Sequence, residues 1–197
     1  MAVYRIYVEK KPEFAVEAAE ILSDIHSTLG ISGVENVRFL NRYDLEDIDV
    51  QDFEMAKKVI LSEPQLDVTY TQLPILKEGS RVFASEYLPG QFDQRADSCE
   101  VCIQLATAKE RPTCRTAKVY ILEGQISDED FAKIQHSLIN PVESRLASLE
   151  PVQTLKMQVE LPDSVAVIQG FISFGKEQLE AFIRENGLAM DYDDILF

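Results

Sequence analysis

The amino-acid sequence predicts an α+β fold, in which helices cover one face of a mostly antiparallel sheet. Three observations favour it. The order strand, helix, strand, helix, strand occurs twice, the strand patterns alternate polar with apolar residues, and glycine-rich phosphate-binding loops are scarce. We therefore expect two ferredoxin-like units in series, packed against each other as a pseudo-dimer, followed by a shorter third segment.

The first unit is expected over residues 1–76. Apolar residues alternate in its strand patterns and recur at helical spacing between them, and Gly30 and Pro64 end the two helical patterns. The predicted elements are, in order, a strand at 3–8, a helix at 14–29, a strand at 37–45, a helix at 53–60 and a short strand from Val68.

The second unit is expected over residues 80–162. Ser127 caps its second helix, whose pattern ends at Asn140-Pro141, and the clearest alternation in the chain, at 155–161, predicts its last strand. Before these come a strand at 81–87, a helix at 92–108 and a strand at 116–122. Setting Tyr4 against Phe83 gives an offset of roughly 80 positions, which indicates a duplication, although chance alternation of elements would look similar.

The third segment, 163–197, is expected to connect to a further domain. A helix at 177–186 stops at Gly187, and the acids and apolar residues of 191–197 look like the first turn of an unfinished helix. We therefore expect the truncated start of a linker domain here.

Charge and cysteine usage restrict the function classes. Asp and Glu outnumber Lys and Arg by 34 to 19, and the formal net charge of −15 disfavours nucleic acid and anionic membranes as partners. The N-terminus begins with a strand pattern and no apolar run spans a bilayer, so we expect a cytoplasmic protein. Cys99, Cys102 and Cys114 are predicted to be free thiols, the first two buried in the apolar stripe of a helix rather than binding zinc.

Catalytic groups are scarce. The two histidines, His26 and His136, lie far from plausible partners, and no nucleophile elbow, dinucleotide fingerprint or metal-ligand pair is present. We expect no catalytic residue, no metal ligand and no cofactor in this segment.

The polar stretch from Glu86 to Ser98 joins a strand to a helix through Pro89-Gly90. Asp93-Gln94-Arg95 can be a phosphate or carboxylate site, since arginine binds such groups in a bidentate manner. Alternatively, Asp93 or Gln94 caps the helix and Arg95 makes a surface ion pair. Arg145 can pair with an acidic neighbour or contact another domain, or it can be a surface residue at a helix-to-helix corner.

Several separated stretches resemble the N-terminal part of large single-chain bacterial phosphoribosylformylglycinamidine synthases: Arg5–Lys11, Tyr87–Ser98, Asn140–Arg145 and Asn186–Leu196. The resemblance covers the whole chain. In the family that the chain resembles, the N-terminal domain is similar to a fused version of the small separate subunit of shorter-chain synthases, and the resemblance implies the same for this chain. It implies a non-catalytic scaffold in purine biosynthesis, which positions the synthetase, linker and glutaminase domains of the same polypeptide. ATP, magnesium and glutamine would bind outside this segment, and the complete enzyme would amidate formylglycinamide ribonucleotide.

On this reading, the expected interdomain interface comprises Gln91, Phe92, Asp93, Gln94, Arg95 and Arg145. The alternative function is a regulatory module that binds a small molecule at the seam between the two units, with Arg95 and Arg145 as anion anchors. A third possibility, an independent enzyme, is disfavoured by the scarcity of catalytic groups.

Overall fold

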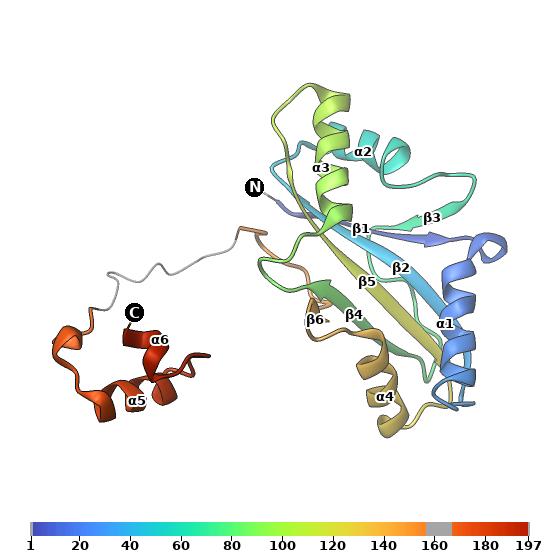
Figure 1. The fold of residues 1–197 in the computed structure, drawn as a ribbon. Helices are drawn as coiled ribbons and strands as arrows, with labels where there is room; N and C mark the ends of the chain where they lie inside the picture. Colours follow the sequence, from blue (N-terminus) through green and yellow to red (C-terminus); the bar gives the residue numbers. More distant parts are fainter. Residues whose placement is uncertain (1, 157–166, 197) are drawn as a thin grey trace. The chain divides into compact units, whose positions relative to one another are not determined.

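The computed structural model describes residues 2–156 and 167–196, which belong to two separate compact units divided after Lys156. The first unit is a mixed α+β structure with a six-stranded antiparallel sheet, so the predicted fold class is confirmed (Figure 1). Among the described residues, no helix is long and apolar enough to cross a bilayer.

The sheet has the order β3-β1-β2-β5-β4-β6, and β2 and β5 run side by side through its middle (Figure 1). The elements are β1 (Tyr4–Lys10), the 3-10 turn η1 (Pro12–Phe14), α1 (Val16–Ser27), β2 (Val34–Glu46), α2 (Val50–Val59), β3 (Asp67–Tyr70), β4 (Arg81–Tyr87), α3 (Gln94–Thr107), β5 (Thr113–Gly124), α4 (Asp128–Leu138) and β6 (Ser144–Ala147).

The two halves of the sheet have the same register after a shift of 77 positions. Arg81 and Leu122 pair in β4 and β5 just as Tyr4 and Leu45, each 77 positions earlier, pair in β1 and β2. The outer strands follow the same shift, with Tyr7 opposite Tyr70 and Ala84 opposite Ala147. At the centre, Asn41 of β2 lies opposite Lys118 of β5, the residue 77 positions after it.

The turns at the ends of the strands obey the same shift. The N–H of Lys11 donates to the carbonyl of Leu66 at 2.8 Å, and the N–H of Leu88 donates to the carbonyl of Glu143 at 2.9 Å. Prolines recur at the same spacing, at positions 12 and 89 and at positions 64 and 141. The correspondence therefore includes local backbone contacts as well as strand order.

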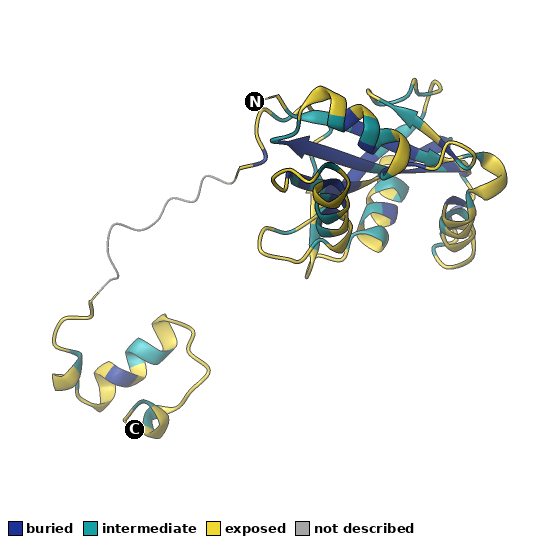
Figure 2. Ribbon diagram, turned by 90° about the horizontal axis from the view of Figure 1, so that it is seen from above, coloured by how far each residue is buried: buried dark blue, intermediate teal, exposed yellow. Residues whose placement is uncertain are grey.

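All four helices of this unit cover one face of the sheet, here called the helix face. α2 and α3 pack over one end of that face, against Ile6 and Leu45, while α1 and α4 pack over the other end, against Phe39 and Leu122. Figure 2 shows buried residues concentrated on the strands and exposed residues on the outer sides of the helices. The middle of the helix face lies between these two helix pairs.

The opposite face, here called the strap face, is covered by two irregular segments, strap 1 (residues 71–80) and strap 2 (residues 148–156). Leu73 and Leu76 of strap 1 and Leu149 of strap 2 pack on the third apolar cluster, which includes Leu40 and Val119. Burial of these leucines fixes the straps to the sheet by removing apolar surface from water.

Each strap ends on a buried carboxylate of a central strand. Lys77 Nζ of strap 1 donates to Glu123 Oε2 at 2.5 Å, and the Leu155 N–H of strap 2 donates to Glu46 Oε2 at 2.7 Å. Glu46 and Glu123 are again 77 positions apart. Strap 1 thus ties the first half of the chain to β5, and strap 2 ties the second half to β2.

A cluster of buried charges lies under strap 2. Asp44, 1% exposed, accepts from Arg5 Nε at 2.5 Å and Nη2 at 3.0 Å, and lies 3.2 Å from Arg42 Nε. Arg42, 2% exposed, donates to the carbonyl of Ser148, and Arg5 donates to the carbonyl of Leu149. The Asp44 carboxylate therefore forms ion pairs with two guanidinium groups that also hold the strap.

The second unit is described over residues 167–196 and contains the 3-10 turn η2 (Phe171–Ser173), α5 (Lys176–Glu185) and α6 (Tyr192–Leu196). Phe171 packs against Phe174 and Phe182, with ring centroids 5.5 and 5.4 Å apart. The predicted helix before Gly187 and the predicted helical turn near the C-terminus are confirmed. Gly187 follows α5 at a φ of 61°, which suits glycine.

Most predicted elements of the first unit are confirmed, including both bounds of the strand at 81–87, but the first two residues of the last predicted strand, at 155–161, are not in a strand. Leu155 and Lys156 are not in a strand, and residues 157–161 of that prediction lie outside the described residues. The third strand of the second half is β6, in a stretch for which a helix-to-helix corner was one of our two interpretations. β6 forms because its backbone pairs with the open edge of β4, a long-range contact that a four-residue sequence pattern does not reveal.

Candidate functional site

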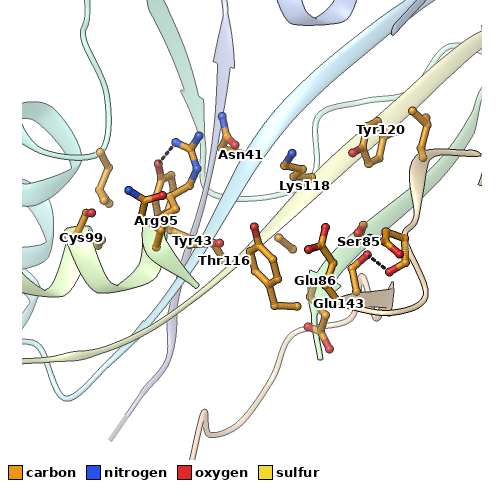
Figure 3. A pocket seen from close by; sticks show the side chains of 18 of the residues that line it. Asn41, Tyr43, Ser85, Glu86, Arg95, Cys99, Thr116, Lys118, Tyr120 and Glu143 are labelled. Carbon is orange, nitrogen blue, oxygen red and sulfur yellow. Dashed lines mark hydrogen bonds between the residues drawn. The ribbon is translucent and has the colours of Figure 1, made fainter. Parts of the chain in front are cut away.

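A pocket of about 550 Å3 opens on the helix face, between α3 and the turn that leads from α4 to β6. Its floor comes from β2, β5 and β4, and its walls from the first turns of α3 and from Asn140 to Ser144 (Figure 3). The volume falls in the range typical of small-molecule sites. It lies where neither helix pair covers the sheet.

Asp93 fixes the α3 wall of this pocket. As the N-cap of α3, its Oδ1 accepts the Ala96 N–H at 2.9 Å, and its Oδ2 accepts from the Thr116 N–H at 3.2 Å and from Thr116 Oγ1 at 2.7 Å. One carboxylate thus satisfies a free helix N–H and anchors the helix start to β5. The capping interpretation of Asp93 is confirmed.

Arg95 lines the pocket one residue into α3. Its Nη1 donates to the Tyr43 hydroxyl at 3.1 Å, the contact drawn as a dashed line in Figure 3. Partial burial works to lower the pKa of Arg95, but its contact with Tyr43 and the nearby carboxylates Glu17 and Asp93 raise it, and the net pKa lies above its ordinary value. Burial raises the pKa of Tyr43, so at neutral pH a cationic guanidinium faces a neutral phenol.

Lys118 is the second cation of the pocket. It rises from the floor on β5, directly opposite Asn41 of β2, and its side chain is exposed. Among the described residues, neither Lys118 nor Arg95 lies within 4.0 Å of a carboxylate oxygen, in contrast to 13 other lysine and arginine residues that do. The pocket therefore holds two cations without a protein counter-charge in direct contact.

Two acidic residues also line the pocket. The carboxylate of Glu86 pairs with Arg145, at 2.8 Å, and lies 3.8 Å from Arg42, one of the buried charges under strap 2, so it lies toward the strap face. Glu143 is exposed at the rim and makes no ion pair among the described residues. The positive side of the pocket, at Arg95 and Lys118, is thus chemically distinct from its acidic rim.

A smaller pocket of about 270 Å3 lies on the same face, between α1 and the end of α2. It shares Asn41, Tyr43 and Arg95 with the larger pocket, so the two meet near the middle of the sheet. Its own lysine, Lys10, is neutralised by Asp67 at 2.8 Å.

The structure brings only part of the expected interface together. Gln94 and Arg95 line the pocket, whereas Gln91 is exposed and Phe92 is 70% exposed, and neither lines it. The surface ion pair expected of Arg95 was wrong, because its partner is the Tyr43 hydroxyl. Arg145 lies in β6 and pairs with Glu86, as one alternative expected, but on an edge strand rather than at a corner between helices.

Sequence reasoning missed Asn41, Tyr43 and Lys118. Asn41 and Lys118 are polar residues at strand positions where the alternation predicts apolar ones, which is the signal that would have pointed to them. The predicted apolar stripe of α3 was wrong for Cys102, which is exposed and lines the pocket, while Cys99 is buried as expected. A hydrogen bond with Cys99, together with burial, raises the pKa of Cys114, so that thiol stays protonated.

Both histidines lie outside the larger pocket. His26 contacts the Val34 carbonyl at 2.7 Å, and His136 is exposed near the end of α4. No group of three or more metal-ligating side chains occurs among residues 2–156 and 167–196. A comparison of the sequence with protein-family models and with curated proteins finds no match.

Proposed function

We propose that this chain is the N-terminal scaffold region of a phosphoribosylformylglycinamidine synthase, built from two fused ferredoxin-like units. The single observation that carries the proposal is the common 77-position shift, which relates strand register, turn contacts and strap contacts in the two halves. A fused copy of a dimeric small subunit, as the sequence resemblance implies, would have this arrangement. The central β2 and β5 contact would then correspond to the subunit interface.

The straps give such a scaffold rigidity. Each half donates a strap that ends on a glutamate of the other half, so neither half can move without breaking buried contacts. A rigid body of this kind suits a role in which larger domains are held in register, because the interface geometry then depends little on the scaffold's own motion.

Surface residues near α3 are the proposed contact with the remainder of the polypeptide. Phe92 and Leu105, 70% and 76% exposed, are large apolar side chains at opposite ends of that helix. Exposed aromatic residues are common anchors of interfaces. The synthetase, linker and glutaminase domains are the proposed partners, and ATP with magnesium would bind to them.

The test is reconstitution. The 197-residue chain and the remainder of its polypeptide are produced separately, and glutamine- and ATP-dependent amidation of formylglycinamide ribonucleotide is measured with and without the chain. We expect the remainder to be inactive alone and active with the chain. The Phe92→Ala variant of the chain should reach half-maximal activity only at a higher concentration than the parent chain. The Val142→Ala variant should not, although Val142, beside β6, is comparably exposed. A remainder that is fully active alone would refute the proposal.

A further inference from the structure

We propose that the larger pocket binds a small organic oxyanion, with its phosphate or carboxylate group held between Arg95 and Lys118. Figure 3 shows the two side chains on the same pocket, Arg95 from α3 and Lys118 from β5, with Asn41 between them in this view. A guanidinium and an ammonium together supply the charge-assisted donors that such groups require. The inference does not rest on the scaffold proposal.

The first argument is the absence of a protein partner for these two cations within the described residues. In a chain of net charge −15, most lysine and arginine side chains have a carboxylate within ion-pair distance, as the ion pairs of Lys10, Lys109 and Arg111 illustrate. Among residues 2–156 and 167–196, Arg95 donates a hydrogen bond only to the neutral Tyr43 hydroxyl, so its other N–H donors can bind a ligand.

The second argument is the comparison of the two pockets. Under the 77-position shift, four residues of the smaller pocket each correspond to a more positive residue of the larger one: Ala18 to Arg95, Asn41 to Lys118, Glu17 to Gln94 and Asp67 to Ser144. Two differences have the opposite sign. The larger pocket has the neutral Tyr87 where the smaller pocket has Lys10, and its lining residues include Glu86 and Glu143. The changes concentrate positive charge at Arg95 and Lys118 and place the acids elsewhere.

The third argument concerns the floor and the mouth. Asn41 Oδ1 is a buried acceptor that has no hydrogen-bond partner among the described residues, so a donor on the organic body of the ligand, such as a hydroxyl or amino group, would satisfy it, whereas the oxyanion itself would not. Tyr87, 41% exposed, presents an aromatic ring beside the polar groups. The pocket therefore suits a phosphate or carboxylate attached to a small organic body rather than a free ion alone.

The experiment titrates the isotope-labelled 197-residue chain with inorganic phosphate and, separately, with succinate at constant ionic strength, and follows backbone amide resonances. We expect saturable shifts confined to the pocket, at Ser98, Thr116 and their neighbours. Saturation by phosphate alone, by succinate alone or by both supports the site and identifies the preferred oxyanion. Absence of saturable shifts with both probes overturns the proposal.

Three charge variants make the test specific. Lys118→Gln and Arg95→Gln should each weaken binding about tenfold, as expected for loss of a charge-assisted hydrogen bond. Lys133→Gln removes the same charge from the exposed side of α4, where Lys133 pairs only with Glu129, and should leave the affinity unchanged. Equal weakening by Lys118→Gln and Lys133→Gln would show a mere charge effect and overturn the proposal. If Arg95→Gln perturbs the fold, the comparison of Lys118→Gln with Lys133→Gln decides the outcome, because Lys118 is exposed.

Discussion

Replacement of Asp44 by asparagine should be among the most destabilising single polar changes in this chain. The substitution keeps the size of the side chain but removes the charge that faces Arg5 and Arg42, whose side chains are 11% and 2% exposed. Removing one member of a buried ion pair costs about 3–5 kcal/mol, because the remaining charge stays desolvated without a partner. We expect a value of about 3 kcal/mol, since the asparagine oxygen can still accept a hydrogen bond and Glu86 remains 3.8 Å from Arg42.

The assay is urea unfolding of the 197-residue chain at neutral pH, followed by far-ultraviolet circular dichroism. A loss of about 3 kcal/mol is a large part of the stability of a typical domain. Asp128→Asn is the matched control: Asp128 also pairs with an arginine, Arg81, but its side chain is 93% exposed, so the loss should stay below about 1 kcal/mol. If Asp44→Asn and Asp128→Asn destabilise the chain equally, the buried cluster does not stabilise the fold as argued.

Three further changes test separate parts of the fold by the same unfolding assay. Contacts with the Leu155 N–H and the Thr154 hydroxyl hold the pKa of Glu46 below its ordinary value, so Glu46 binds fewer protons in the folded chain than in the unfolded chain. Its contribution to stability is present above the unfolded pKa and is lost as the pH falls through the folded pKa. The Glu46→Gln variant should therefore lose less stability than the parent chain between about pH 6 and about pH 3, and an identical loss would contradict this. Gly124→Ala should cost at least about 3 kcal/mol, because a Cβ there would lie 2.2 Å from a backbone oxygen, whereas Gly90→Ala, also at positive φ but in open space, should cost about 1 kcal/mol; similar losses would refute the proposed clash. Asp93→Ala should cost about 2–4 kcal/mol, more than the roughly 1 kcal/mol of Ser127→Ala, because Ser127 only caps a helix whereas Asp93 also holds β5; equal losses would show that the β5 contacts add nothing.

The elements could be predicted where the sequence itself carries the determining interaction. Ser127 caps α4 through the Asp130 N–H, Gly30 adopts a φ of 69° after α1, and the strand at 81–87 consists of β-prone residues. These features depend on neighbours within a few residues, so a local pattern is sufficient. The same reasoning gave the correct fold class.

The straps and β6 could not be predicted in this way. Strap 1 has no period, and its leucines are held by the far side of a sheet assembled from both halves. β6 has four residues and gains its conformation from pairing with β4, and Leu155, which the alternation placed in a strand, instead donates its N–H to Glu46. In each case a contact distant in sequence overrides a local pattern.

The larger pocket could be predicted from the sequence only in part. Its strand-turn-helix wall at Asp93 and Arg95 was found from the sequence, but its floor requires the pairing of β2 with β5, which no local pattern provides. The predicted offset of roughly 80 positions was larger than the shift of 77 positions that the strand registers share. The recurring prolines at 12 and 89 and at 64 and 141 would have given the shift of 77, since turn residues are fixed by backbone geometry whereas core residues exchange freely.

Fusion of two copies into one chain, as proposed here, would also explain why a lysine lies on the floor of the larger pocket at Lys118 and an asparagine at the corresponding position, Asn41. In a dimer of identical subunits, the residue on the two-fold axis meets its own copy across the interface. Asn41 and Lys118 are such a pair, and a lysine at both positions would place two ammonium groups on directly opposed residues, which is destabilising. Once the copies are joined, one can keep asparagine while the other acquires lysine. An asymmetric anion pocket at the axis is therefore open to the fused chain and is disfavoured in a symmetric dimer.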